Sequence, residues 1–62
     1  MSMAYQVTLE LDGGRRLVYV VKATGSTSAA HRARGELARQ HPSEAYTAIV
    51  VAVQPAPEPD PG

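Results

Sequence analysis

The chain contains no cysteine, phenylalanine or tryptophan, and its three tyrosines are its only aromatic residues. Without cysteine it can form neither a disulfide bond nor a thiolate metal site. Without large rings, a chain of 62 residues has little apolar volume with which to fill a core. Domains this small often gain stability by association, so we expect one small domain that binds a partner.

Long hydrophobic runs are also absent from the sequence. No apolar run approaches the roughly 20 residues that a membrane-spanning helix requires. The first residues lack the basic segment followed by an apolar one that marks a secretory signal. We therefore expect a cytoplasmic protein that does not contact a membrane.

Residues that could carry chemistry are few and badly placed for it. His31 and His41 lie near the two ends of a predicted helix, about 15 Å apart at a rise of about 1.5 Å per residue, so they cannot share a metal ion. The hydroxyl groups of residues 26–28 precede His31, but no acid is placed to orient its imidazole. The sequence therefore predicts a non-enzymatic protein with no metal and no cofactor.

A β-hairpin is predicted for the first third of the chain. Residues 4–11 alternate in polarity, with Tyr5, Val7 and Leu9 on one face. The sequence Asp-Gly-Gly at residues 12–14 favours a tight turn, because glycine adopts positive φ angles at little cost. Residues 15–23 then form the returning strand.

The register of this hairpin has two solutions. A three-residue loop puts the odd-numbered residues of the second strand on the apolar face of the first strand. A two-residue loop puts Val18 and Val20 there instead, because a slip of one residue exchanges the two faces. We favour the three-residue loop, since it places Arg16 and Lys22 on the polar face. Val18 and Val20 are then left on the outer face.

A helix is predicted over residues 29–40, with Ser26 as its N-cap. Ala30, Ala33 and Leu37 share one face and should pack against the sheet. The opposite face carries Arg32, Gly35, Glu36 and Arg39. Pro42 disfavours helical geometry in the residue before it, so the helix should end near residue 41.

A third strand is predicted over residues 45–53, which are apolar on both faces. One face would carry Thr47, Ile49, Val51 and Val53, and the other Tyr46, Ala48, Val50 and Ala52. Residues 54–62 contain four of the five prolines, and they predict a disordered tail after a domain of residues 1–53.

The order β-β-α-β predicts an α+β fold with a three-stranded antiparallel sheet. The first strand is central, which gives the spatial order 2-1-3, and the single helix covers one face. The uncovered face would expose an apolar surface typical of an interface, formed by Val18, Val20, Tyr46, Val50 and Ala52. We therefore predict a homodimer, formed by sheet packing or by pairing of edge strands, that binds another protein.

The distribution of charge supports a second hypothesis. The net charge is zero, yet all basic residues lie between positions 15 and 39, and the only acid in this segment is Glu36. In this hypothesis the phosphates of a nucleic acid contact Arg15, Arg16, Arg32, Arg34 and Arg39. Against it, the sheet lacks the aromatic residues on which bases stack.

The order of these segments also carries a resemblance. Residues 5–11, the turn at 12–14, residues 20–23, the Ser/Ala-rich start of a helix and a valine-rich last strand follow one another. In this order the chain resembles the short β-β-α-β proteins encoded by bacteriophages and other mobile elements. The resemblance implies an accessory protein that binds a host protein or a nucleic acid, and it transfers no functional residue.

Overall fold

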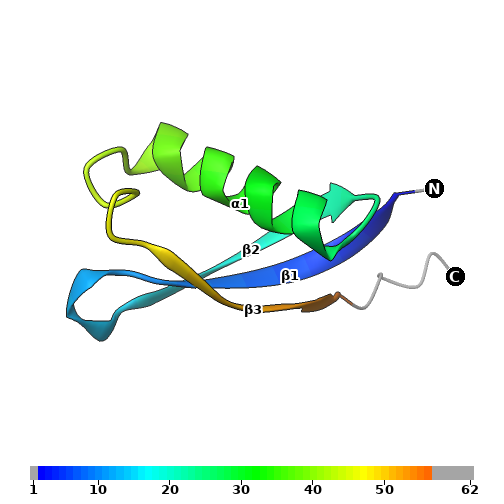
Figure 1. The fold of residues 1–62 in the computed structure, drawn as a ribbon, viewed down its shortest axis with the longest axis horizontal. Helices are drawn as coiled ribbons and strands as arrows, with labels where there is room; N and C mark the ends of the chain where they lie inside the picture. Colours follow the sequence, from blue (N-terminus) through cyan, green and yellow to red (C-terminus); the bar gives the residue numbers. More distant parts are fainter. Residues whose placement is uncertain (1, 57–62) are drawn as a thin grey trace, which may run out of the picture.

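Three strands and one helix follow one another in the computed structural model, which describes residues 2–56. They are β1 (Met3–Glu10), β2 (Arg16–Ala23), α1 (Ser26–Gln40) and β3 (Ile49–Pro55), with a short 3-10 turn, η1 (Asp12–Gly14), between β1 and β2. The sheet is antiparallel with the order β2-β1-β3, and α1 covers one of its faces (Figure 1). The predicted α+β fold with a 2-1-3 sheet is thus confirmed.

The hairpin adopts the register that the three-residue loop requires. Leu9 pairs with Leu17, so the odd-numbered residues of both strands face α1. The turn closes through a hydrogen bond of 2.6 Å from the Leu11 N–H to the Arg15 carbonyl. Gly13 and Gly14 have φ angles of 83° and 82°, a conformation that disfavours any side chain. The polarity of the two strands was therefore sufficient to choose between the two registers.

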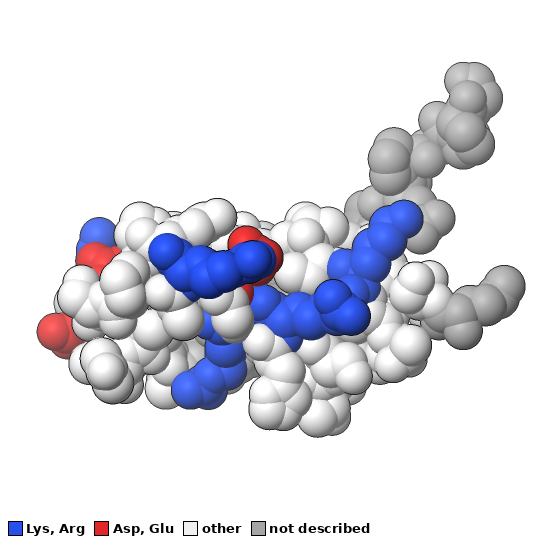
Figure 2. Space-filling model, turned by 90° about the horizontal axis from the view of Figure 1, so that it is seen from above, with Lys and Arg blue, Asp and Glu red and all other residues white. Residues whose placement is uncertain are grey.

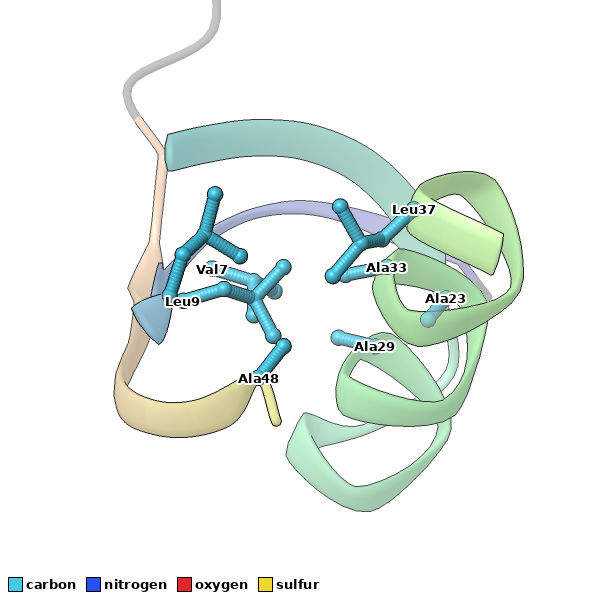
Figure 3. Packing of buried hydrophobic residues seen from close by; sticks show 8 residues of the cluster. Val7, Leu9, Ala23, Ala29, Ala33, Leu37 and Ala48 are labelled. Carbon is cyan, nitrogen blue, oxygen red and sulfur yellow. The ribbon is translucent and has the colours of Figure 1, made fainter. Parts of the chain in front are cut away.

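The core lies between β1 and α1 and contains only small and medium side chains (Figure 3). Its buried residues are Val7, Leu9, Leu11, Ala23, Ala29, Ala33, Leu37 and Ala48. Four of these eight are alanine, so the helix lies close to the sheet. The largest fully buried side chains are those of Leu9, Leu37 and Val7.

Two predictions about the helix are wrong. The helix begins at Ser26, so this residue is already helical and the N-cap is Gly25, with no capping side chain. The buried stripe is Ala29, Ala33 and Leu37, while Ala30 is only half-buried. Residues spaced by four lie in a row nearly parallel to the helix axis, and this row packs on the sheet. The predicted end is confirmed, because His41 caps the helix with its N–H bonded to the Leu37 carbonyl.

The third strand was predicted over residues 45–53, but it begins later, at Ile49, and ends later, at Pro55. Residues 42–47 form turns, held by backbone bonds such as that from the Thr47 N–H to the Glu44 carbonyl. The strand continues through Pro55, and the Ala56 N–H donates to the Ala4 carbonyl at 2.9 Å. Proline is tolerated because β3 is an edge strand. The predicted tail therefore does not begin at residue 54, and its residues 57–62 lie outside the described part of the chain.

A β-bulge in β3 changes which of its residues face outward. Thr8 pairs with Ala52 and the next residue, Leu9, pairs with Val50, so Val51 is an extra residue on β3. Val50 consequently faces α1, and Ile49 lies on the outer face. The prediction that Val50 lies on the outer face is wrong, because it assumed an unbroken alternation.

Candidate interaction surfaces

The outer face of the sheet is the first candidate surface, since no element among the described residues covers it. Val18, Val20 and Ile49 are 54%, 65% and 56% exposed, and Ala52 is also exposed. The pairing places Val18 and Ala52 on either side of Thr8 on the central strand. We call the set Val18, Val20, Ile49 and Ala52, together with Gln6 and Thr8 between them, the outer face. Its apolar residues lie on the two outer strands and its middle is polar, while Arg16 and Lys22 flank the valines at the two ends of β2.

Two of the five residues predicted for this interface lie elsewhere. Val50 packs against the core, as described above. Tyr46 is 93% exposed in the turns before β3 and lies on the side of α1. There it lines a hollow of about 480 Å³ together with Arg34 and Ala38 of the helix. Ile49 lies on the outer face instead. This difference could not be predicted, because the strand is apolar throughout and no polar side chain distinguishes its two faces.

Three of the five arginines predicted to contact nucleic acid form ion pairs within the protein. Arg15 pairs with Glu44, and Arg16 pairs with Glu10 at 3.4 Å, both near the hairpin end. Arg39 pairs with Glu36 one turn earlier on the helix. Exposed ion pairs contribute at most about 1 kcal/mol, so these contacts alone do not prevent an arginine from binding an anion.

The placement of the other two arginines matters more. Arg32 and Arg34 flank the buried Ala33, and neighbouring helical residues point about 100° apart. Arg32 therefore lies towards β2, whereas Arg34 lies towards the turns that precede β3. The structure does not gather the five predicted arginines into one surface.

A groove between α1 and β2 is the second candidate surface, and sequence reasoning missed it. It has a volume of about 610 Å³. We call this the α1–β2 groove, and it is lined by Tyr19, Val20, Val21, Lys22, Arg32, Gly35, Glu36 and Arg39. Basic side chains run across much of the molecule when it is seen from the side of α1 (Figure 2). At one point the Tyr19 hydroxyl donates a hydrogen bond to Gln40 Oε1 at 3.1 Å and links strand to helix.

The open edge of β2 borders this groove. In an antiparallel pair, alternate residues direct both backbone groups towards the neighbouring strand. The bond between Leu11 and Arg15 shows that the odd-numbered residues of β2 are the ones that bond β1. The N–H and C=O groups of Arg16, Val18, Val20 and Lys22 therefore point to the open edge. β2 is an edge strand among the described residues, so these groups have no strand to pair with.

The described residues contain neither a cluster of metal-binding groups nor a buried polar side chain. Among residues 2–56 no polar or charged side chain is buried, and no three His, Asp or Glu residues lie close enough to hold a metal ion. Within the same range, no helix has the length and apolar character needed to cross a membrane. The absence of catalysis, metal and cofactor stays a prediction, as does the cytoplasmic location.

Comparison of the chain with protein-family models, with curated proteins and with solved structures found no match. The resemblance to accessory proteins of bacteriophages therefore stays a prediction. The outer face and the α1–β2 groove are the two surfaces whose chemistry indicates a function.

Proposed function

We propose that this protein is a non-enzymatic interaction module that forms a homodimer through its outer face and binds another protein. The observation that carries the proposal is the exposure of Val18, Val20 and Ile49 on a sheet face that no described element covers. Apolar side chains grouped in this way on a small domain are typical of an interface.

The small core supports association. One copy has three large side chains that are fully buried, and the outer face exposes three large apolar side chains. A symmetric dimer would bury six such side chains, because each copy contributes the same surface. Full burial of a valine or isoleucine stabilises by about 1.5–3 kcal/mol, and these side chains are about half exposed. At about half of that value for each of the six side chains, dimerisation would contribute about 4.5–9 kcal/mol per dimer.

The polar residues of the outer face fit an interface of this kind. Glu10 pairs with Arg16 across the strands and lies in the last row of the sheet, where it would form a solvated rim. Gln6 and Thr8 are half-buried and carry groups that can donate and accept hydrogen bonds across the interface. A charged group would therefore not have to be buried at the centre.

Analytical ultracentrifugation tests the dimer over concentrations from about 5 to about 500 µM, which covers weak and moderate dissociation constants. We expect a dimer that Val18→Lys converts to a folded monomer, because each copy would have to bury a lysine charge in the apolar interface. Tyr46→Lys adds the same charge on the side of α1 and should leave the dimer intact. A monomer throughout this range would contradict the proposal.

Two other outcomes would point to other interfaces. If Val18→Lys remains dimeric, pairing of edge strands replaces packing of outer faces, since a side chain on the face does not obstruct backbone pairing. Steep loss of binding to duplex DNA, single-stranded DNA or RNA between about 50 and 200 mM salt would support the nucleic-acid hypothesis. The dispersal of the arginines over different sides of the protein weighs against that outcome.

A further inference from the structure

We propose that the α1–β2 groove binds an extended acidic segment of a partner protein, which adds to the sheet as a fourth strand beside β2. The proposal specifies the chemistry of the partner for the interaction module inferred above, and it rests on that function only in taking the ligand to be a protein. It does not require the dimer, because the groove lies between α1 and β2 while the proposed dimer packs on the opposite face of the sheet, and Val20 borders both surfaces.

The backbone of β2 can pair with an extended peptide. Arg16, Val18, Val20 and Lys22 direct unpaired N–H and C=O groups to the open edge, as derived above from the hairpin register. An extended peptide pairs with such an edge through alternating donors and acceptors, and its side chains supply specificity. The edge is 8 residues long, which suffices for a peptide of similar length.

The charge of the groove specifies the side chains of this peptide. Arg32 and Arg39 stand about two helical turns apart on the margin of α1 that faces β2. Glu36 is the only acid in the lining, and it is paired with Arg39. No carboxylate among residues 2–56 forms an ion pair with Arg32 or with Lys22 on the strand side. Acidic side chains on the helix-facing side of the peptide would complement Arg32 and Arg39, and Lys22 would lie beside the face of the peptide that points away from α1.

Gly35 provides room for the ligand beside these cations. It lies between Arg32 and Arg39 along the helix, and a Cβ atom built at this position would meet nothing within 4 Å. No protein atom obstructs a ligand side chain that reaches the helix here, and Gly35 also borders the hollow on the Arg34 side. Every second residue of an extended peptide faces the same side, so an alternating acidic sequence presents one row of carboxylates to α1.

A peptide fits this groove better than a nucleic acid does. The edge of β2 offers carbonyl acceptors as well as N–H donors, and a phosphate backbone has no donors to match the carbonyls. Tyr19, the only aromatic residue in the lining, already bonds Gln40 through its hydroxyl. Stacking platforms for bases are thus absent from the described groove.

A second copy of the chain is also a poorer occupant of the same edge. Symmetric pairing of two β2 edges would place both helices on one face of a continuous sheet. The basic margins of the two helices, each with Arg32 and Arg39, would then face each other across the join. Like charges in this arrangement repel, whereas an acidic peptide is attracted.

The experiment uses a fluorescein-labelled peptide of alternating glutamate and valine that matches the 8 residues of β2. Fluorescence anisotropy with the full chain should show saturable binding that weakens between about 50 and 200 mM salt, because the contacts are ionic. A peptide of alternating lysine and valine should not bind. The glutamate peptide with N-methyl groups on alternate backbone nitrogens should also not bind, because it cannot pair with β2.

Matched variants separate the groove from general charge. Arg32→Ala should weaken binding by about tenfold, because it removes a cation beside the peptide. Arg34→Ala makes the same change of charge on the other side of Ala33 and should leave binding unchanged. Equal effects of the two variants would overturn the proposal in favour of unspecific attraction.

Hydrogen exchange provides an independent readout of strand addition. On binding, the amides of Val18 and Val20 should become protected, while those of Leu17 and Tyr19, already bonded to β1, should change little. Binding without this alternating protection would overturn the proposal, as would tighter binding of single-stranded DNA to the same groove. A monomeric protein that binds the glutamate peptide would refute only the dimer, whereas a dimer that ignores the peptide would refute only this inference.

Discussion

Replacement of Gly35 by alanine should stabilise the protein. Gly35 lies in the middle of α1, where glycine costs about 1 kcal/mol relative to alanine because of its greater backbone freedom in the unfolded chain. The new methyl group would meet nothing within 4 Å, so no steric cost opposes the gain. For a domain of this size, about 1 kcal/mol raises the midpoint of thermal unfolding by roughly 4–8 °C.

Two controls isolate the backbone as the cause. Ala38→Gly makes the opposite change at an exposed position one turn later in the same helix and should lower the midpoint by a similar amount. Gly13→Ala also places a methyl group in open space, but Gly13 has a φ angle of 83°. A side chain in this left-handed conformation costs about 1–2 kcal/mol, so this variant should be destabilised.

Thermal unfolding followed by circular dichroism at 222 nm, the standard helix signal, is the assay, with chemical unfolding in urea as a second measure of the free energy of unfolding. The reasoning is refuted if Gly35→Ala lowers the midpoint while Ala38→Gly behaves as expected. Such a result would mean that a neighbour occupies the space beside Gly35, in contradiction to the open groove on which the peptide proposal depends.

Three further predictions follow from burial. Leu37→Ala should leave the chain largely unfolded at 25 °C by circular dichroism, because Leu37 is 1% exposed. Its loss costs about 2–5 kcal/mol, similar to the whole free energy of unfolding of a small domain. A folded spectrum would contradict the assigned core. Tyr46→Ser should shift the free energy of unfolding in urea by less than about 0.5 kcal/mol, since Tyr46 is almost fully exposed; a larger loss would show that its ring packs on the domain. Ile49→Lys should remain folded and weaken the dimer in ultracentrifugation, whereas Val50→Lys should prevent folding; the reverse pattern would show that the bulge at Val51 is absent.

Much of the fold could be predicted because neighbouring residues carried the signal. The alternation in β1 and the charges in β2 chose the hairpin register, since the other register would have placed Arg16 in the core. The two glycines of η1 fixed the turn, because their φ angles are unfavourable for other residues. Pro42 indicated the end of α1 for a local reason as well.

The candidate surfaces were less predictable, because they depend on residues far apart in the sequence. Val18 and Val20 were placed correctly, since they follow from the hairpin register alone. Val50 was not, because every residue from 48 to 53 is apolar and no polar side chain marks the bulge. The α1–β2 groove was missed because it exists only once the helix is packed beside the edge of β2.

The sequence by itself determined the order of the elements, the central position of β1 and the small size of the core. These properties follow from the turn glycines, from the alternation of polarity and from the shortage of large side chains. All three act locally or through composition, so they do not depend on how distant segments pack. Only the tertiary structure decided that Ala29 rather than Ala30 is buried, that Ile49 rather than Val50 faces outward, and that Arg32 and Arg34 serve different surfaces. These outcomes depend on how closely an alanine-lined helix approaches the sheet and on where β3 bulges, and both are settled by packing between distant segments.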